Sequence, residues 1–434
     1  MILSVLVVCL IFEFLMAIFL FKADVLAPAV VFSFVFVISS LDLMLMSDYW
    51  NVTIQSVTLW IIVIGVLSFI IGSYLAKNVR FIRISVGGLS LVNYQENFRI
   101  SRSFLNFMIA VYILFIGISM LYVIRSRGVS SAITGLFSSY VTALGDDTEL
   151  ELPVFLSLPS KFLLLGGYIW GYFLVNNWII NHKLEVRYII LFVLTLVMSV
   201  SNGKRGELVA LVITLVIYIL FALKKNRSKK LSKKVYFTLF LILIAVALSF
   251  QSIATMMGRD SDLFEPLEYF SIYLGAPILN LNTSILRAGF KHPIFLSETF
   301  HSLYTAIGEN FGIDPFIYTT DRIFWSSPNG KRVGNVATTF YDFYHDGAFM
   351  GVIALSFIMG FIVQSLYNGL KHEKFKNGMF ATMVYSYMLW MVGRSFFANS
   401  FFDWFTLSTI FTLLIWWLYT VTIPKIGLRR RKKV

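Results

Sequence analysis

The stretch SNGKRGELVAL, residues 201–211, places two adjacent cations and a carboxylate between two apolar runs. If both runs cross a membrane, Lys204, Arg205 and Glu207 lie in a connection too short to carry them away from its surface. A guanidinium group offers several N–H donors in a fixed fork and keeps its charge, which suits phosphate. Arg205 is therefore the first candidate ligand for a phosphate or pyrophosphate group. Glu207 is expected to orient or neutralise Lys204 or Arg205.

A second group of residues suits proton transfer. In the stretch NVATTFYDFYHDGAFMG, helical spacing puts Thr338, Asp342 and His345 at i, i+4 and i+7, on one face. An aspartate close to a histidine fixes the tautomer of the imidazole and raises its basicity. Asp342 with His345 is thus one candidate base, and His301 is a second. The alternative interpretation is that His345 and Asp346 simply end a helix or lie at the water interface.

The composition requires that these residues be positioned by membrane-spanning helices. The chain is 58% hydrophobic and 14% charged, whereas soluble domains carry about 25% charged residues. Apolar runs long enough to cross a bilayer as helices recur along the whole length. We predict an all-α polytopic integral membrane protein, with residues 1–434 as a single membrane domain. The predicted spans, about eleven in number, are 2–21, 25–46, 54–76, 104–124, 154–175, 188–202, 207–223, 235–252, 347–370, 378–394 and 402–423.

The distribution of positive charge predicts the orientation of these spans. Alternate connections divide the 36 Lys and Arg residues unequally, with 24 on one side of the membrane. Cytoplasmic connections carry the excess, so the N-terminus is expected outside and the C-terminus in the cytoplasm. Lys204 and Arg205 then lie on the outer face, against the usual bias, and are not topology signals. The other outer arginines that are candidate phosphate ligands are Arg259, Arg287, Arg322 and Arg394. Their alternative role is to reach lipid headgroups.

One connection is long, and we expect it to be functional. Residues 253–346 form a large extracytoplasmic loop between the eighth and ninth predicted spans, and loops beyond about 15 residues usually carry function or are disordered. Its mixture of apolar, aromatic and turn residues is not typical of disorder. DLFEPLEYFSIYLG and APILNLNTSILRAG predict amphipathic or re-entrant helices. SETFHSLYTAIG predicts a helix with Ser297 as its N-cap, and SSPNGKRVG predicts a turn.

Several classes of function are excluded or disfavoured. The net charge of +13 comes mostly from short flanks of apolar runs, so we expect no nucleic-acid partner. No pair of histidines or carboxylates has convincing metal-ligand spacing, and no Gly-rich phosphate loop is present, so we expect neither metal nor cofactor. Glu13 lies within the first apolar run, and a coupled transporter would use such an acid, but no second acid or strong base occurs near the middle of another span. The aromatic stretch 394–405 is either an interfacial belt or a platform for sugar rings.

Together these features resemble the O-antigen polymerase family, the oligosaccharide repeat-unit polymerases of bacterial surface-polysaccharide assembly. The resemblance rests on the short outer connection SNGKRGE, in which an Arg-Gly step opens the next span. It rests also on one large late outer loop that contains LSETFHSLYTAI. A third element is the stretch NVATTFYDFYHDGAFMGV, which leads from that loop into a span.

The resemblance implies an enzyme, a metal-independent glycosyltransferase of the bacterial cytoplasmic (inner) membrane. Such an enzyme transfers a glycan from polyprenyl pyrophosphate to the non-reducing sugar of another lipid-linked repeat unit at the outer face. Its product is O-antigen, capsule or exopolysaccharide. The expected partners are the polyprenyl-pyrophosphate-linked oligosaccharide, membrane lipids, a chain-length regulator and a flippase. Arginines would stabilise the departing pyrophosphate, and His301 or the Asp342–His345 pair would accept the hydroxyl proton. The alternatives are a lipid-linked glycan flippase or transporter, and an O-antigen ligase-type glycan transferase.

Overall fold

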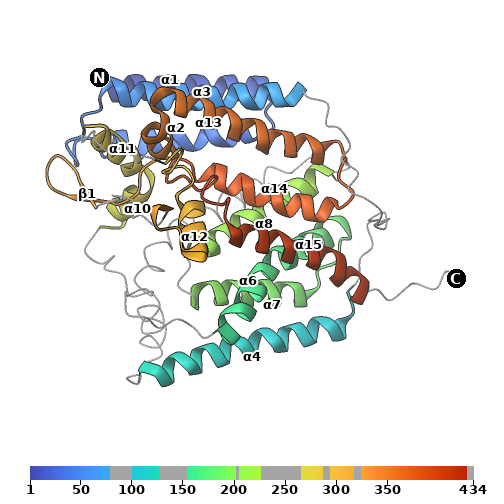
Figure 1. The fold of residues 1–434 in the computed structure, drawn as a ribbon. Helices are drawn as coiled ribbons and strands as arrows, with labels where there is room; N and C mark the ends of the chain where they lie inside the picture. The colour runs from blue at the N-terminus through green and yellow to red at the C-terminus, as the bar shows by residue number, and fades with distance from the viewer. Residues whose placement is uncertain are drawn as a thin grey trace. The chain divides into compact units, whose positions relative to one another are not determined.

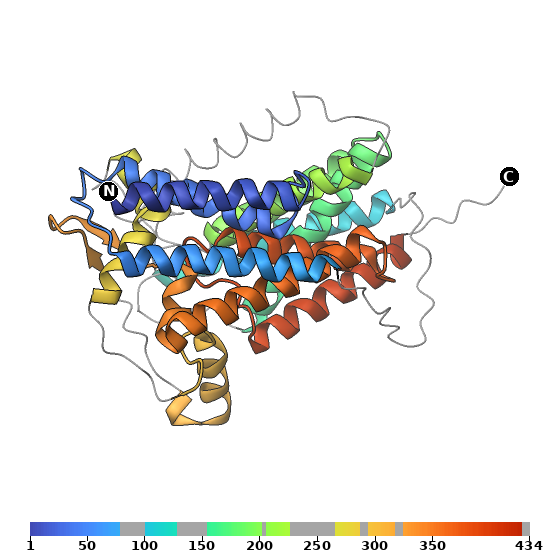
Figure 2. The ribbon, with the colours of Figure 1, turned by 90° about the horizontal axis from the view of Figure 1, so that it is seen from above.

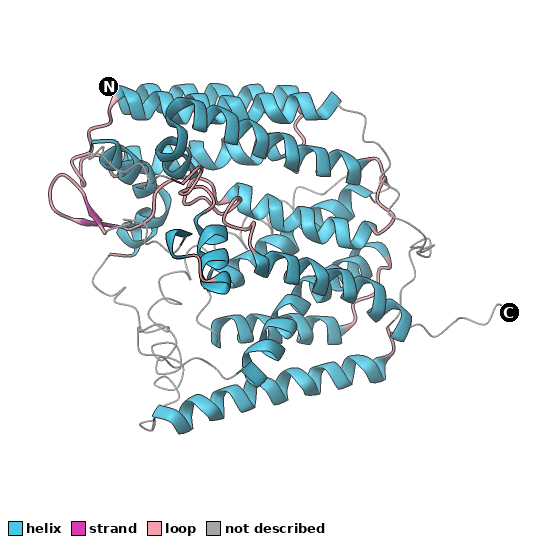
Figure 3. Cartoon of the chain, in the orientation of Figure 1, coloured by secondary structure: helices cyan, strands magenta, loops and turns pink. Residues whose placement is uncertain are grey.

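The computed structural model describes residues 1–78, 100–127, 154–201, 205–225, 265–286, 294–316 and 324–427, and these are almost entirely helical (Figures 1 and 3). The longer helices are α1 (Ile2–Leu20), α2 (Pro28–Leu45), α3 (Ser56–Asn78), α4 (Arg102–Arg127), α6 (Val154–Val175), α7 (Val186–Ser201), α8 (Arg205–Lys225), α13 (Thr339–Lys371), α14 (Gly378–Gly393) and α15 (Leu407–Gly427). The shorter elements are η1 (Asn176–Ile180), α10 (Pro266–Leu274), α11 (Ala276–Leu286), α12 (His301–Phe311), η3 (Asp314–Phe316), β1 (Trp325–Ser326) and β2 (Arg332–Gly334).

The helices coincide with the spans predicted from hydropathy. Helices occupy ten of the eleven predicted spans, and the remaining one, 235–252, lies outside the described residues. Seven of the described helices are long and apolar enough to cross a membrane. The mostly helical class is therefore confirmed and fits a polytopic membrane protein. The number of spans and their orientation stay predictions.

Contacts between the elements divide the chain into two compact units. Unit 1 comprises Met1–Gly87, Pro266–Phe375 and Tyr387–Phe411, and unit 2 comprises Gly88–Glu265, Lys376–Ser386 and Thr412–Val434. The helices α14 and α15 each contribute residues to both units. The single membrane domain over residues 1–434 stays a prediction.

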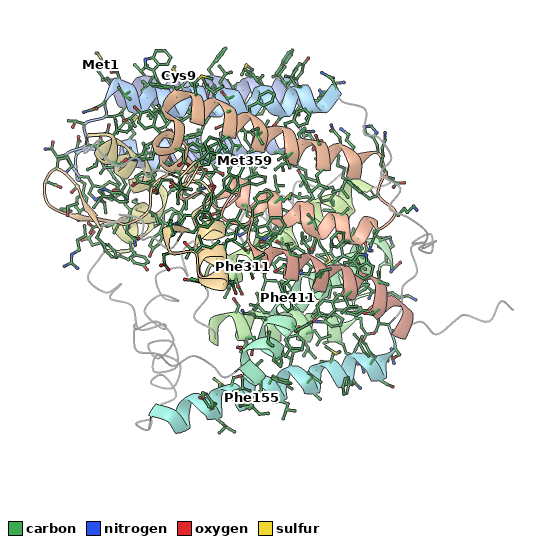
Figure 4. The ribbon with its side chains drawn as sticks, viewed as in Figure 1. Met1, Cys9, Phe155, Phe311, Met359 and Phe411 are labelled. Atoms are coloured by element: carbon green, nitrogen blue, oxygen red, sulfur yellow. The ribbon has the colours of Figure 1, made fainter. Side chains whose placement is uncertain are left out.

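The core of unit 1 is built on a close contact between α3 and α13. An ideal Cβ on Gly72 of α3 would lie 2.2 Å from the carbonyl oxygen of Phe357, and one on Gly360 of α13 would lie 2.3 Å from that of Phe69. Only glycine fits at such backbone-to-backbone approaches, which are typical of helix pairs in membranes. The hydroxyl of Ser73 also donates to the Gly360 carbonyl at 3.2 Å. Met359, next to Gly360, is fully buried (Figure 4).

Unit 1 has two chemically different ends. At one end Lys77 donates to the Leu20 carbonyl at 2.7 Å, and Lys371 lies 3.7 Å from the carboxylate of Asp24. Figures 1 and 2 show α10, α11 and the β1–β2 hairpin at the other end, beside the N-terminus. The segments of the long loop that belong to unit 1 thus lie away from the cations that were predicted to face the cytoplasm.

Polar side chains attach α10 and α11 to the helices of unit 1. The side-chain oxygen of Asn282 accepts bonds from the Gln55 N–H and the Thr58 hydroxyl, both at 2.8 Å. The hydroxyl of Ser271 donates to the carboxylate of Asp42 at 3.0 Å. Because these bonds are buried and directional, they fix the position of the two short helices relative to α2 and α3.

Unit 2 is held by aromatic side chains that bond to helix carbonyls. Tyr112 of α4 donates to the Leu163 carbonyl at 2.5 Å and accepts from the indole N–H of Trp170 at 3.1 Å. Trp416 of α15 donates to the Leu165 carbonyl at 3.2 Å. These bonds satisfy Tyr and Trp donors that are buried between apolar helices, and they join α4 and α15 to α6.

Replacement of Gly360 with leucine tests the contact between α3 and α13. Gly360→Leu is expected to lower the free energy of unfolding by about 1–3 kcal/mol, the usual cost of overpacking. The matched control is Gly117→Leu in α4, where an added Cβ meets no described atom within 4 Å. Thermal unfolding of the detergent-solubilised protein, followed by size-exclusion chromatography, measures both. Equal midpoints for the two variants would contradict the close approach.

Candidate functional site

The first candidate, Arg205, is the first residue of α8 in unit 2. Glu207 lies half-buried in the first turn of the same helix, where a carboxylate is stabilised by the helix dipole. That local role is sufficient to explain an acid at this position and is compatible with the predicted role toward Arg205. The predicted ligands Lys204, Arg259, Arg287 and Arg322 lie outside the described residues. The remaining candidates belong to unit 1 and are described separately.

The helix α13 is interrupted close to its beginning. Its backbone leaves helical geometry at Gly347 (φ −150°) and at Ala348, which has a φ of 47°. The corner is tight, because a Cβ on Gly351 would lie 2.2 Å from the Phe343 carbonyl oxygen. The first segment therefore ends at Asp346, and the remainder of α13 continues as the long apolar helix. The predicted span at 347–370 corresponds to this second segment.

The first segment of α13 carries one of the two predicted bases. Asp342 is buried, with 1% of its surface exposed, and His345 is half-buried. The His345 ring lies 4.3 Å from the ring of Tyr341, centroid to centroid, and tilted by 42°. The segment is fixed at its start, where the Thr339 N–H donates to the Ser395 carbonyl at 2.8 Å. His345 thus lies on a short helical segment that is bonded to Ser395 at its start and ends at the interruption at Gly347.

The other predicted base, His301, is the first residue of α12. The preceding residues, which we call the 294–300 turn, are not helical. The two carboxylate oxygens of Asp346 accept bonds from the backbone N–H groups of Glu298 and Thr299, at 3.0 and 2.7 Å. The residue that follows His345 is therefore bonded to the turn that precedes His301. The structure brings together the two elements that carry the alternative bases.

This contact corrects the predicted start of α12. Ser297 is not the N-cap, because the helix begins four residues later and its N-cap residue, Phe300, makes no side-chain capping bond. The N–H groups of Glu298 and Thr299, with which a helix capped by Ser297 would begin, are bonded to Asp346 instead. Asp346 is a residue whose contact the sequence analysis missed. Its only sequence signal is a polar residue directly before Gly347.

The segment that follows α14 completes the surroundings of α12. The side-chain amide of Asn399 donates to the Thr299 carbonyl at 2.9 Å, and the hydroxyl of Ser302 lies 3.4 Å from an oxygen of Asp403. The guanidinium of Arg394 lies 5.5 Å from the centre of the Trp390 ring, within the distance of a cation–π contact. Of the arginines predicted to bind phosphate, Arg394 is the one whose side chain the structure describes.

The aromatic stretch 394–405 is partly core. Phe401 and Phe402 are buried, with 0% and 4% of their surface exposed, and the Phe402 ring packs against Phe300 and Phe343 at 5.4 Å. Neither predicted role, interfacial belt or sugar platform, applies to these two side chains. They instead join the 294–300 turn and the first segment of α13 in one apolar cluster.

Among the described residues, no three His, Cys, Asp or Glu side chains come close enough together to hold a metal ion. The contacts around α12 are instead those of Asp346 and Asn399 with the 294–300 turn and of Asp403 with Ser302.

The family model for the O-antigen polysaccharide polymerase Wzy matches residues 1–336, most of the 434-residue chain. The chain belongs to this family. It is therefore a multi-pass membrane protein and a glycosyltransferase-type polymerase of lipid-linked oligosaccharide repeat units. The match includes α8, α10, α11 and α12 with His301, and it ends before Asp342, His345 and Arg394. No curated protein and no solved structure matches the chain.

The interruption of α13 makes a prediction about Ala348. Because glycine adopts a positive φ without a Cβ clash, Ala348→Gly is expected to stabilise the protein by about 1 kcal/mol. The matched control is Ala354→Gly, at an exposed helical position of α13, which is expected to destabilise by about the same amount. Thermal unfolding of both variants measures the difference. A loss of stability in both would show that α13 is helical at residue 348.

Proposed function

We propose that the chain polymerises lipid-linked repeat units at the outer face of the bacterial cytoplasmic membrane, in the synthesis of O-antigen, capsule or exopolysaccharide. The donor is a glycan on polyprenyl pyrophosphate, and the acceptor is the non-reducing sugar of a second lipid-linked unit. The observation that carries the proposal is the match of the O-antigen polymerase family model to residues 1–336. Membrane lipids, a chain-length regulator and a flippase are its proposed partners.

The proposed reaction is a single displacement at the anomeric carbon of the donor glycan. A hydroxyl oxygen of the acceptor sugar forms the new bond to that carbon, and the bond from the carbon to the pyrophosphate oxygen breaks. The lipid pyrophosphate leaves with the electron pair, and the hydroxyl proton passes to a base on the protein. Positive side chains stabilise the leaving group, so the reaction is proposed to proceed without a metal.

His301, or Asp342 with His345, is proposed as the base. The contact between Asp346 and the 294–300 turn supports both assignments, because it places the beginning of α12 beside the end of the first segment of α13. A base needs a defined position relative to the hydroxyl that it deprotonates. His301 is the first choice, because it lies within the matched range and His345 lies outside it.

The arginines are proposed to bind the pyrophosphate, in the order Arg205, Arg287, Arg322 and Arg259, with Arg394 as a further ligand. Lys204, in the connection before α8, and Glu207, in the first turn of α8, are proposed to support Arg205. The location of Arg205 at the beginning of a helix supports its role, since the positive end of the helix dipole also attracts an anion.

The outer face is proposed as the site of reaction because of the charge distribution. In unit 1, Lys77 and Lys371 lie at the ends of α3 and α13, as expected for the cytoplasmic side. Of the described loop segments, α10, α11 and the β1–β2 hairpin lie at the other end of that unit (Figure 2). The substrate is therefore proposed to bind where the loop and the beginning of α13 meet.

Complementation of a deletion strain tests the proposal. Arg205→Ala is expected to abolish the ladder of long glycan chains and to leave single repeat units on the outer leaflet, because the leaving group loses its counter-charge. The matched control is Arg332→Ala, which removes an exposed cation of β2 that has no proposed role. Lipid-linked glycans are resolved by size and assigned to a leaflet by enzymatic labelling of intact cells. A full ladder in Arg205→Ala would contradict the assignment.

The same experiment separates the alternative functions. Single units that accumulate on the inner leaflet of the deletion strain would identify a flippase. Long chains that form normally on the lipid but are not transferred to a second acceptor would identify a ligase. Only single units on the outer leaflet support the polymerase.

Glu13 provides an independent test against transport. Its side chain is buried in α1, with 4% exposed, and its Oε2 atom accepts no bond from the described residues. A proton-coupled transporter would require this acid, whereas chemistry at the outer face does not. Glu13→Gln is therefore expected to leave the glycan ladder unchanged in the complementation assay. Retention of single units on the inner leaflet by this variant would favour a transporter.

A further inference from the structure

We propose that Asp346 is a positioning residue of the polymerase: its carboxylate holds the 294–300 turn and thereby sets the position of His301. This inference rests on the proposed role of His301 as the base. It concerns a residue outside the range matched by the family model, which ends at residue 336.

The contact uses both oxygens of one carboxylate. Oδ1 accepts the Glu298 N–H at 3.0 Å, and Oδ2 accepts the Thr299 N–H at 2.7 Å. Hydrogen bonds in which the acceptor is ionised are shorter and stronger than those between neutral groups. Two such bonds to consecutive N–H groups fix the orientation of the peptide planes and the distance of the turn from α13. A neutral amide could replace one acceptor but would direct an NH₂ group toward the second N–H.

The interruption of α13 explains why Asp346 occupies this position. It is the last residue before the non-helical backbone at Gly347 and Ala348. The short segment that it ends is fixed at its beginning by the bond from Thr339 to Ser395. The position of Asp346 is therefore fixed, and its two hydrogen bonds fix the 294–300 turn relative to α13.

Contacts on both sides of His301 make its backbone sensitive to Asp346. Asn399 donates to the Thr299 carbonyl at 2.9 Å, the Phe300 ring packs against Phe402 at 5.4 Å, and Ser302 lies 3.4 Å from Asp403. Residues 298, 299, 300 and 302 are each held by a partner distant in sequence. The backbone of His301 is thus constrained from both directions, and Asp346 supplies two of the bonds on its N-terminal side.

Asp346 is not itself proposed as the base. Both of its oxygens already accept backbone N–H groups of the 294–300 turn. Its effect on the reaction should therefore pass through His301. This dependence distinguishes a positioning residue from an independent contribution to stability or binding.

A double-mutant cycle on the full-length protein tests the dependence. The variants are Asp346→Asn, His301→Gln and the double variant, reconstituted in vesicles with a polyprenyl-pyrophosphate-linked repeat unit. Each single variant is expected to lower kcat by at least tenfold with little change in KM. The double variant is expected to lie within about twofold of His301→Gln, because non-additivity identifies groups that act as one unit. Asp346→Glu, which keeps the charge and both acceptors, should recover part of the rate.

Hydrogen exchange supplies a readout that does not depend on activity. In Asp346→Asn the amides of the 294–300 turn should exchange at least tenfold faster, while those at the end of α12 keep their protection. Asp314→Asn is the matched control, since Asp314 is an exposed carboxylate in η3 of the same loop. It should change neither exchange in the turn nor kcat. A thermal unfolding midpoint for each variant confirms that it folds.

The outcomes separate failure of this inference from failure of the proposed function. Multiplicative effects in the double variant, or full activity in Asp346→Asn, would overturn the positioning role alone. Full activity in His301→Gln would overturn His301 as the base and the positioning role with it. Unchanged exchange in the 294–300 turn would overturn the contact itself. Absence of polymerisation by the wild-type protein would overturn the proposed function.

Discussion

Unit 1 depends on the close approach of α3 and α13. In a bilayer there is little hydrophobic drive to bring two apolar helices together, so packing and interhelical hydrogen bonds must do so. Gly72 and Gly360 allow the two backbones to touch, and Ser73 adds a hydrogen bond to the same point. The long second segment of α13 is therefore a fixed support. The interruption at Gly347 and Ala348 can then redirect the chain without loosening the bundle.

That interruption creates the environment in which the candidate bases lie. Non-helical backbone is tolerated near a membrane only where other protein groups satisfy or cover it. Here the first segment of α13 is bonded at its start to Ser395, and Asp346 at its end bonds to the 294–300 turn. The apolar side of the same segment packs Phe343 against Phe402. The first segment of α13 thus contacts both the 294–300 turn and the segment after α14, and we call this three-part contact the junction.

The sequence predicts the helices well and the junction poorly. Hydropathy locates the spans, because a helix is the usual way for an apolar stretch to satisfy its backbone in lipid. The contact of Asp346 with the turn joins residues 47 and 48 positions apart, and no local pattern encodes it. The local capping rule applied to Ser297 was wrong for this reason. The positive φ at Ala348 was not predictable either, because alanine rarely adopts it. The burial of Phe401 and Phe402 was not predictable, because an interfacial belt is also rich in aromatic residues. Of the candidate site, the sequence supplied two alternative candidates for the base, whose role stays a prediction, but it did not predict that the elements carrying them are in contact.

The described segments of the long loop share one mode of attachment. Asn282 bonds α11 to the residues before α3, and Asp346 bonds the 294–300 turn to α13. Asn280 bonds α11 to the carbonyl of Val333 in β2 and to that of Val336 after the hairpin. Each uses a planar side chain that engages two partners at once, which restricts orientation more than a single bond does. Asn329 ties the hairpin tip to the Tyr49 carbonyl in the same way. A glycosyl transfer needs its base fixed relative to a substrate held by the membrane helices, and misplacement by about 1 Å is costly. Loop segments bonded side chain to backbone at several points meet that need, whereas a loop attached only at its ends does not.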